Sequence, residues 1–308
     1  MTALHVTAAA SPLDFPELWP RLDFQGASTA FVFQTAELLD LWRRTIGKAR
    51  GVAPLFLRIA EPSGEPLMLL ALGVERRSGG VRVLTFLDGG VSDYNAPVLL
   101  ANLTRLRNLP PALLWEAVAN AVPSFDVASL EKMPSHVLGL NNPICQWARS
   151  PSAPSAHVIG LAGTWNDFVK TRLHRAKDSR RKLRRLEEHG TVRFVVAKTS
   201  AAVERLLPVL IAQKTRRYLE LNNSDGFERP GYRDYYRLAT GELFDRGVLH
   251  LSALEVGDDV IATHWGLVWS KRFYSLVLAF ADHPLAAYSP GRLLIEHLVE
   301  WSFANGLR

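Results

Sequence analysis

The sequence is poor in cysteine: Cys145 is the only one in 308 residues. A single cysteine cannot form an intramolecular disulfide, so a disulfide-stapled secreted fold is excluded and a reducing compartment, the cytoplasm, is expected. No His and Asp pattern accompanies Cys145, which we therefore interpret as structural. No Cys, His and Asp spacing typical of a metal site occurs, so we expect no metal.

Long apolar runs are also lacking. No stretch of about 18 consecutive apolar residues occurs, which argues against a transmembrane helix. The first residues, Met1 to Phe15, have neither a basic start nor a continuous apolar stretch, so no secretory signal is expected. Hydrophobic residues make up 48% and charged residues 21% of the chain, a composition that favours globular domains over disorder. The length fits two domains of about 150 residues each.

Positive charge is concentrated in one segment. The formal net charge is +6, yet Lys170 to Arg185 contains nine Lys or Arg residues and one acid, Asp178. That segment carries +8, so the remainder of the chain sums to −2. An electrostatic partner would therefore bind there.

This basic segment has three interpretations. It is a solvated helix face, a site for an anionic substrate such as a nucleotide-linked sugar or a phosphate-bearing glycan, or a nucleic-acid site. Nucleic acid is the least favoured, because only Trp165 and Phe168 supply aromatic rings nearby. Lys214, Arg216 and Arg217, on a later helix, would extend the same basic patch.

The pattern of apolar residues predicts an α/β order. A Pro- and Ser-rich linker, Ser150 to Ala156, divides the chain. The predicted elements are a helix over 34–45, strands over 55–59, 67–74 and 81–87, a helix over 109–121, one long basic helix over 165–188, a strand over 191–197, helices over 201–219 and 232–245, strands over 248–256, 260–269 and 273–280, and a helix over 292–304.

The two halves resemble each other at an offset of 194 residues. Leu57 then aligns with Leu251 and Asp88 with Asp282. The remaining aligned pairs are Leu55 with Leu249, Glu61 with Glu255, Tyr94 with Tyr288, Leu99-Leu100 with Leu293-Leu294 and, after a one-residue gap, Gly64 with Gly257 and Gly73 with Gly266. Each half reads as three strands, a loop with Tyr, and leucines, which indicates an internal duplication.

Four segments carry a resemblance to a known family: residues 92–95 (SDYN), 178–190 (DSRRKLRRLEEHG), 260–266 (VIATHWG) and 288–294 (YSPGRLL). Together with the element order, they resemble the acetyltransferase (GNAT) fold. The tandem arrangement resembles the branch that includes the Fem-type transferases and the acetyltransferases of cellulose-biosynthesis operons (CelD/BcsL-like). The resemblance implies an α/β (α+β) fold of two GNAT-like domains with mixed, mostly antiparallel sheets flanked by helices.

This resemblance divides the chain into five parts. They are a lead segment over 1–29, a degenerate GNAT-like acceptor platform over 30–150, a linker over 151–163, a basic helix over 164–190, and a GNAT-like acyl-CoA-binding domain over 191–308. In the family, a further strand follows the last helix, and the pantetheine arm lies between it and the third strand of the meander. We therefore expect the second domain to lack its last strands, which makes the chain a fragment or an inactive protein and opens the edge of strand 273–280.

The predicted donor site is the turn before the last helix. Ser289, Pro290, Gly291 and Arg292 would place a helix N-terminus, a glycine and a cation against the pyrophosphate of CoA, as the resemblance implies. A capped helix with Pro in its first turn is the structural alternative. The family's Gln/Arg-x-x-Gly-x-Gly/Ala pattern is met only at Gly291, and the first half has Pro97 there. A backbone N–H near Phe280 would meet the oxyanion.

Two residues are candidates for proton transfer, and six for binding the acceptor. His264 is a candidate base, and Asp282 either shares that role or orients His264. A core histidine and a turn aspartate are the structural alternatives. The candidate acceptor-binding residues are Asp93, Tyr94, Asn95, Lys214, Arg217 and Tyr288.

We therefore expect a cytoplasmic, acyl-CoA-dependent N-acyltransferase, with acetyl-CoA or another acyl-CoA as co-substrate. The acceptor would be an amine on a small molecule or a glycan, in cell-envelope or exopolysaccharide biosynthesis. The amine would attack the thioester directly, since no nucleophile motif indicates a covalent intermediate. The alternative is a non-catalytic module whose basic helix holds an anionic glycan or nucleic acid.

Overall fold

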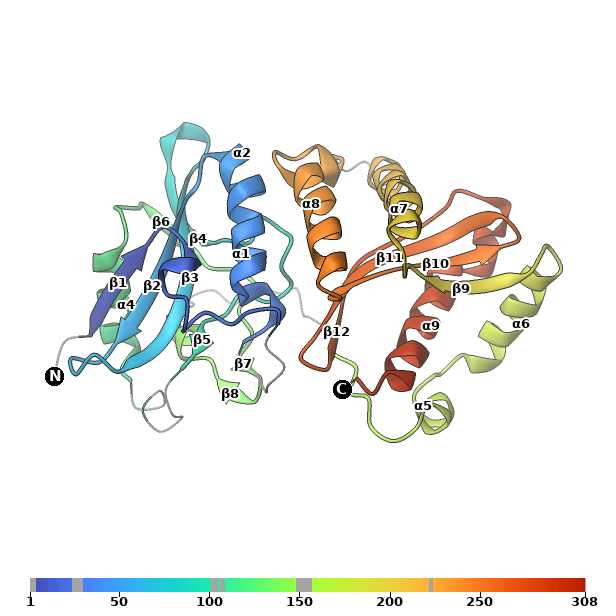
Figure 1. The fold of residues 1–308 in the computed structure, drawn as a ribbon, viewed down its shortest axis with the longest axis horizontal. Coiled ribbons are helices and arrows are strands. Elements are labelled where there is room, and N and C mark those ends of the chain that lie inside the picture. The colour runs from blue at the N-terminus through green and yellow to red at the C-terminus, as the bar shows by residue number, and fades with distance from the viewer. Residues whose placement is uncertain are drawn as a thin grey trace. The chain divides into compact units, whose positions relative to one another are not determined.

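The computed structural model describes residues 4–23, 30–100, 105, 109–147, 157–221 and 224–307. It divides into two compact units (Figure 1). The N-terminal unit comprises Met1–Ala156 and Pro230–Ala239, and the C-terminal unit comprises His157–Arg229 and Thr240–Arg308. The predicted linker core, Ser150 to Ala156, lies outside the described residues.

The sheet of the N-terminal unit has the order β1-β2-β3-β4-β6, with β5 also paired to β3. Its strands are β1 (His5–Ala9), β2 (Ala53–Ala60), β3 (Pro66–Arg76), β4 (Arg82–Phe86), β5 (Val98–Leu99) and β6 (Val127–Ser129). Neighbours are antiparallel except β4 and β6, which pair in parallel with Val83 opposite Val127. The apolar run of β3 is buried almost throughout, as expected of a central strand covered on both faces.

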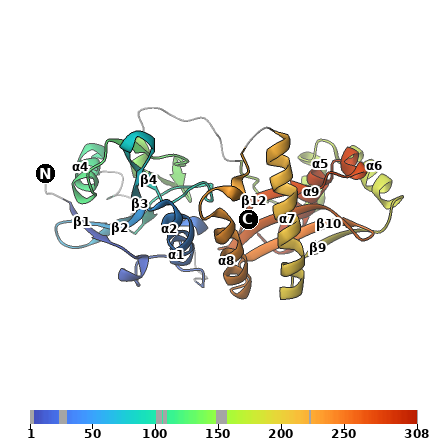
Figure 2. The same ribbon diagram turned by 90° about the horizontal axis from the view of Figure 1, so that it is seen from above.

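Helices cover both faces of this sheet. Figure 2 shows α1 (Ala36–Trp42), which continues through a π-helical turn, Arg43–Gly47, into α2 (Lys48–Arg50), on the face opposite α4 (Pro111–Ala121). The unit also contains β7 (His136–Val137), β8 (Leu140–Asn141) and short 3₁₀ turns. β1 and β6 were not predicted, and β1 makes part of the expected lead segment a member of the sheet.

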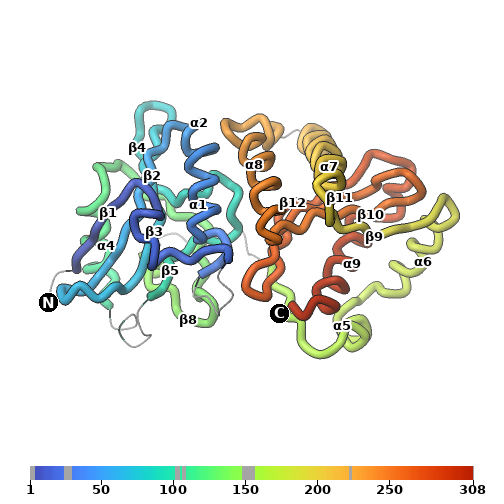
Figure 3. Tube along the Cα trace, viewed as in Figure 1, coloured from blue at the N-terminus to red at the C-terminus, as the bar shows by residue number. Residues whose placement is uncertain are grey.

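The C-terminal unit is built on a four-stranded antiparallel sheet of order β12-β11-β10-β9. Its strands are β9 (Val192–Val196), β10 (Leu249–Val256), β11 (Asp259–Trp269) and β12 (Arg272–Phe280). The predicted three-strand meander is confirmed, with ends that agree within one or two residues (orange in Figure 3). Among the described residues, β12 pairs with β11 alone, so its outer edge has no neighbouring strand.

Helix α7 (Ser200–Glu220) lies on one face of this sheet and α9 (Pro290–Ala304) on the other, as Figures 1 and 2 show. Helix α8 (Tyr232–Asp245) contributes its last residues, from Thr240, to this unit. A core cluster lies beneath α9 and includes Leu186, Leu254, Ile261, Leu294 and Leu298. Leu293, where the family usually has a small residue, is buried in the same cluster.

The single basic helix predicted over 165–188 is wrong. The chain forms α5 (Trp165–Thr171) and α6 (Ala176–Glu187), separated by non-helical residues at Arg172 and Arg175. A capping box of Thr164 and Asp167 begins α5, as such motifs do. Closely spaced cations at the break disfavour a continuous helix, because like charges three or four residues apart repel.

The break allows the two helices to contact different parts of α9. Trp165 and Phe168 of α5 pack on Phe303, with ring centroids 6.1 and 5.5 Å away. Ser179 of α6 instead donates a hydrogen bond to Glu296, nearer the start of α9 (2.7 Å). One straight helix would have to follow a single line across α9.

No helix in the described part of the chain combines the length and the apolar character needed to span a membrane. No group of three or more His, Cys, Asp or Glu side chains that could hold a metal ion occurs among the same residues.

Candidate functional site

The first turn of α9 is arranged as an uncapped helix N-terminus. Ser289 adopts left-handed backbone angles (φ 56°, ψ 55°), and its side chain does not cap the helix. Its carbonyl accepts from Arg292 and Leu293, at 3.1 and 3.2 Å. Within the described residues no acceptor lies on the Gly291 N–H, so this end keeps a free donor and the positive end of the helix dipole.

Gly291 lies beside the end of β12. A Cβ built on it would lie 3.4 Å from Cδ1 of Phe280 and 3.7 Å from Cδ2 of Leu278, ordinary or slightly tight distances to side chains. Its backbone angles are not those that require glycine. The fold therefore does not need glycine here, whereas a ligand that approaches the backbone would.

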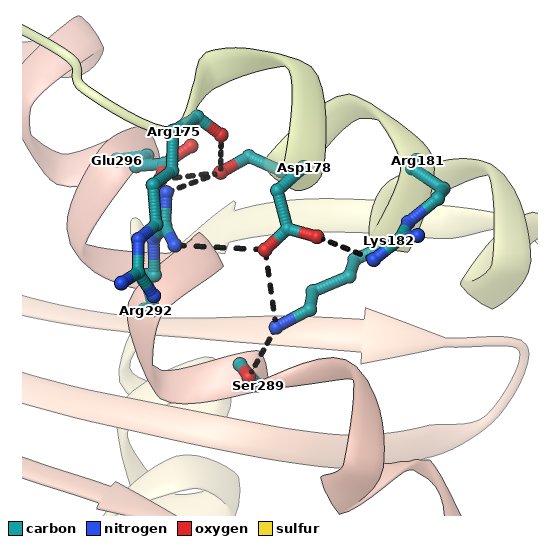
Figure 4. A network of polar contacts seen from close by, with 8 residues as sticks. Arg175, Asp178, Arg181, Lys182, Ser289, Arg292 and Glu296 are labelled. Atoms are coloured by element: carbon teal, nitrogen blue, oxygen red, sulfur yellow. Dashed lines mark hydrogen bonds and ion pairs between the residues drawn. The ribbon is translucent and has the colours of Figure 1, made fainter.

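Polar contacts join α6 to this turn (Figure 4). Lys182 donates to Oγ of Ser289 (2.8 Å) and lies 3.4 Å from Asp178, which also binds Arg181 (2.7 Å). Partial loss of solvation raises the pKa of the Asp178 carboxyl. Hydrogen bonds from Arg181 and Lys182 lower it by more, so this pKa lies below its usual range. The basic run predicted cations here, but nothing in it distinguished Lys182 as the one that reaches Ser289.

Arg292 does not present the free cation that the sequence predicted. Its guanidinium contacts Glu296 (3.0 Å), Ser179 (2.9 Å) and Asp178 (3.7 Å). Arg181, Lys182 and Arg292 thus share two carboxylates, which leaves one net positive charge beside the first turn of α9. This environment still favours an anion, with Lys182 as the cation closest to Ser289.

The outer edge of β12 carries a second set of cations. Ala281 N–H donates to Ile261 of β11, so the preceding carbonyl, of Phe280, points away from β11. This carbonyl accepts from Arg216 (2.6 Å), and the carbonyl of Leu278, two residues earlier on the same edge, accepts from Lys214 (3.3 Å). Two carbonyls that a neighbouring strand would otherwise bind are therefore satisfied by α7.

Lys214, Arg217 and Phe280, predicted separately, come together at this end of β12. The Arg217 guanidinium lies 5.6 Å from the Phe280 ring centroid. Burial, with a smaller contribution from the charge of Arg217, lowers the pKa of Lys214. Figure 1 shows α6 and α7 on opposite faces of the sheet, so Lys214, Arg216 and Arg217 do not extend the exposed basic face of α6, and the expected single patch is wrong.

His264 lies in the interior, without any exposed surface. Its Nε2 is 3.0 Å from Oγ of Ser275, and its Nδ1 has no partner in the described chain. Burial, with a smaller effect of His250, lowers its pKa well below the usual value. Such a ring cannot itself reach a substrate amine, so burial argues against His264 as the base.

Asp282 and Tyr288 lie in the connection from β12 to α9. Asp282 is exposed. It does not orient His264, because the only hydrogen bond of that ring among the described residues is to Ser275. Tyr288 packs against the core cluster beneath α9, and its ring lies 6.1 Å from that of His189. The sequence alternative of a turn aspartate fits the position of Asp282, whereas Tyr288, predicted to bind the acceptor, packs against the core.

The loop with Asp93, Tyr94 and Asn95 belongs to the N-terminal unit. Asn95 is buried and donates to Asp88 (3.2 Å) and to the Glu131 carbonyl (3.1 Å). Tyr94 stacks on Phe31, with centroids 4.6 Å apart. Asp93 is at the surface. Partial loss of solvation raises the pKa of its carboxyl, although the positive charge of Lys132 acts in the opposite direction. Of the three side chains, Asp93 is the one that faces solvent.

Asp88 and Cys145 also lie in the N-terminal unit, and their contacts there are structural. Asp88 holds its loop by accepting hydrogen bonds from the N–H groups of Gly90 and Ser92, both at 2.9 Å, as an aspartate in a turn does. Cys145 lies 3.4 Å from the Pro134 carbonyl, and burial raises the pKa of its thiol, so it is not an activated nucleophile.

Comparison with known proteins finds a similarity in the C-terminal segment. Residues 174–308 match the family model of the acetyltransferase (GNAT) domain. No curated protein matches the chain. A crystal structure of a conserved protein of unknown function from Bacteroides thetaiotaomicron VPI-5482 is similar, with 12% identity, a TM-score of 0.49, and coverage of 97% of this chain and 88% of that chain.

Proposed function

We propose that this protein is an acyl-CoA-dependent N-acyltransferase whose donor site lies between the first turn of α9 and the outer edge of β12. The observation that carries the proposal is the free Gly291 N–H at an uncapped helix end, inside the segment that matches the acetyltransferase domain. Backbone donors and the helix dipole at such an end suit a pyrophosphate. Lys182 supplies a cation on one side.

The cations of α7 suit the same ligand. Lys214 and Arg216 lie at the Phe280 end of β12, and Phe280 is next to Gly291. Phosphate oxygens would compete with the two strand carbonyls for these donors, and charge-assisted hydrogen bonds to phosphate are the stronger ones. In this proposal Ser289, Gly291 and Lys182 bind the pyrophosphate from α9 and α6, and Lys214 and Arg216, which come from the opposite face of the sheet, bind it across the edge at the end of β12.

The pantetheine arm then determines where the chemistry occurs. Its chain has about as many bonds as four to five peptide residues, so when extended it spans about 15 Å. A thioester that follows the edge of β12, as the family resemblance implies, would therefore lie near Ser275 rather than at Phe280. Phe280 and Asp282 are then at the pyrophosphate end, and the proposal gives Asp282 no proton-transfer step.

We also propose that the N-terminal unit is a second, degenerate GNAT-like domain that binds the acceptor. Its meander β2-β3-β4, preceded by β1, has the same antiparallel strand order as β9 to β12. A helix, α4, and a strand parallel to β4 follow, in the order that the resemblance predicts. Asp93 is its candidate contact to an amine. A Fem-type or CelD/BcsL-like membership, and an acceptor from envelope or exopolysaccharide biosynthesis, stay predictions from the resemblance.

Thermal unfolding in the presence of acetyl-CoA tests the donor site. A ligand that binds only the folded state raises the midpoint, and at 100 times its dissociation constant it stabilises by about 2.7 kcal/mol. We expect acetyl-CoA and CoA to raise the midpoint and ATP, a nucleotide polyphosphate without pantetheine, to do so much less. Release of CoA thiol with simple amines such as hydroxylamine then tests transfer. Equal shifts with ATP and acetyl-CoA would contradict the donor site.

Exposed cations on α6 support a second candidate function, the holding of an anionic glycan or nucleic acid. Arg180 and Arg184 are exposed. In the described chain neither has an ion-pair partner, unlike Arg181, which binds Asp178, and Arg185, which binds Glu188. Unpaired cations on one helix face are available to a polyanion without breaking existing contacts.

Replacement of Arg180 and Arg184 by Gln is expected to weaken heparin binding and flatten its salt dependence. Each lost phosphate-like contact lowers the slope of log K against log salt by about 0.7 to 0.9, so a reduction of about 1.5 is expected. Lys48 and Lys198 provide the control, because both are exposed and lie outside α6. If Lys48→Gln with Lys198→Gln changes the slope equally, net charge and not the α6 face binds heparin.

A further inference from the structure

Ser275 is a surface residue whose hydroxyl is hydrogen-bonded to a buried histidine. It is exposed on β12, the edge strand of the C-terminal sheet, and its Oγ lies 3.0 Å from Nε2 of His264, whose ring has no exposed surface. The ring of His264 is otherwise surrounded by aromatic groups, with Phe273 at 5.3 Å and His250 at 5.8 Å between centroids. A hydroxyl at the surface is thus oriented from the interior.

The backbone of β11 and β12 is irregular beside His264 and Ser275, and this irregularity makes room for their contact. The register of β11 and β12 shifts between Trp265, opposite Val277, and Gly266, opposite Ser275, so that Leu276 is an extra residue in β12. Such a bulge redirects a neighbouring side chain. A Cβ at Gly266 would lie 2.5 Å from Cε1 of His264 and 2.4 Å from the Tyr274 carbonyl. Glycine at 266 therefore leaves the space through which the imidazole reaches Ser275.

The tautomer of His264 follows from its surroundings. Burial favours the neutral ring, which has one N–H donor and one acceptor nitrogen. Nδ1 has no partner among the described residues, and a buried N–H without an acceptor is rarer in proteins than an acceptor without a donor. The proton therefore belongs on Nε2, which donates to Ser275. The hydroxyl of Ser275 accepts this bond, so its own O–H is free to donate outward.

We propose that Ser275 donates a hydrogen bond to the thioester carbonyl of the acyl donor, and that His264 is the positioning residue that holds the hydroxyl in this orientation. The inference rests on the proposed function, which places the thioester about 15 Å along β12 from the pyrophosphate. Ser275 lies five residues before Phe280, about 16 Å at 3.3 Å a residue. It thus replaces Phe280 as the group that meets the oxyanion.

The reaction balances without a proton passing through Ser275. The acceptor nitrogen forms a bond to the carbonyl carbon, and the carbonyl electron pair moves onto oxygen. When that oxyanion collapses, the C–S bond breaks and CoA leaves as a thiolate. The nitrogen loses one proton and the sulfur gains one, giving an amide and free CoA. The Ser275 O–H stabilises the oxyanion as a donor only.

Isotope-edited infrared spectroscopy of bound acetyl-CoA, ¹³C-labelled at its carbonyl, tests this directly, with no acceptor needed. In the unaltered protein the carbonyl stretch is expected at lower frequency than in free acetyl-CoA. Ser275→Ala should remove this shift while binding persists. His264→Gln, whose amide can place an N–H near the position of Nε2, should retain most of it, and His264→Leu should lose it. With hydroxylamine as acceptor, Ser275→Ala should slow CoA release by about 100-fold.

Ser252→Ala is the matched control. Ser252 lies opposite His264 on β10, and its buried hydroxyl has no partner among the described residues, so its removal should leave spectrum and rate unchanged. Because Ser275 is exposed on an edge strand, Ser275→Ala should fold. An unshifted carbonyl in the unaltered protein, or an equal shift in Ser275→Ala, overturns the inference and leaves the proposed function standing. Failure of acetyl-CoA to bind the unaltered protein overturns both.

Discussion

Gly291→Asp is expected to abolish detectable binding of acetyl-CoA. The new carboxylate would occupy the space beside the free N–H proposed for the pyrophosphate, and it would repel that group. Two like charges about 4 Å apart near a protein surface interact by about 4 kcal/mol, which corresponds to a loss of affinity of roughly 1000-fold. Isothermal titration calorimetry measures this, and the rise in unfolding midpoint with ligand should disappear as well.

Two companion variants separate repulsion from misfolding. Gly291→Ala adds only a Cβ, with its nearest neighbours at 3.4 and 3.7 Å, so the fold should survive and binding should weaken less than in Gly291→Asp. Gly241→Asp adds the same carboxylate to an exposed helical position with nothing within 4 Å of its Cβ, and it should bind acetyl-CoA normally. If Gly291→Asp folds and binds acetyl-CoA like the unaltered protein, the pyrophosphate binds elsewhere.

The sequence predicted the strands of both meanders because they are long apolar runs bounded by turn residues. It missed β1 and β6 for the opposite reason. β1, His5–Ala9, is a mostly exposed edge strand, and β6, Val127–Ser129, has three residues, so neither shows a burial pattern. Edge strands depend on backbone pairing with a neighbour, which a one-dimensional pattern of side chains does not record.

The duplicated pattern predicted the sheets better than the loops. Leu57 and Leu251 are both buried at matching places in their meanders. Asp88 and Asp282 align equally well, yet Asp88 binds the N–H groups of its loop and Asp282 is exposed. Core positions are fixed by packing against the same kind of neighbours, whereas a loop side chain takes its role from the surrounding sequence.

Part of the arrangement at the candidate site follows from the chain order. The predicted donor residues of α9 lie beside the end of β12, because a connection of nine residues, 281–289, joins the two elements. The roles proposed for Lys182, Arg216 and Ser275 were not evident from the sequence, since each depends on a contact between separate elements of the fold. His264 was selected for its chemistry, and only the fold shows that its ring is buried and lies within hydrogen-bond distance of Ser275.

Lowering the pH from 7 to 4 is expected to destabilise the C-terminal unit partly through His250. This residue is 1% exposed, and burial lowers the pKa of its imidazole from 6.5 to about 4. Its ring faces Phe273, Trp301 and His264, of which only His264 titrates, and the pKa of that ring is also lowered. Below pH 6.5 the imidazole of His250 binds a proton in the unfolded chain but not in the folded chain, so the free energy of unfolding falls as the pH falls towards 4.

His250→Leu should remove this contribution. A difference of about 2.5 pKa units corresponds to about 3 kcal/mol, present in full above pH 6.5 and lost by about pH 4. Relative to the unaltered protein, the variant should therefore gain about 3 kcal/mol between pH 7 and pH 4. It also removes two buried ring nitrogens that lack partners among the described residues, so it should be at least as stable at pH 7. Urea unfolding followed by circular dichroism at each pH gives both values.

His174 supplies the control, because its ring is exposed in the turn between α5 and α6. His174→Leu removes an imidazole without relieving any burial, so its stability should follow that of the unaltered protein at every pH. The comparison is between variants at one pH, which cancels the carboxylates common to all three proteins. A His250→Leu curve parallel to that of the unaltered protein from pH 7 to pH 4 would mean that the ring of His250 is protonated as readily in the folded chain as in the unfolded one.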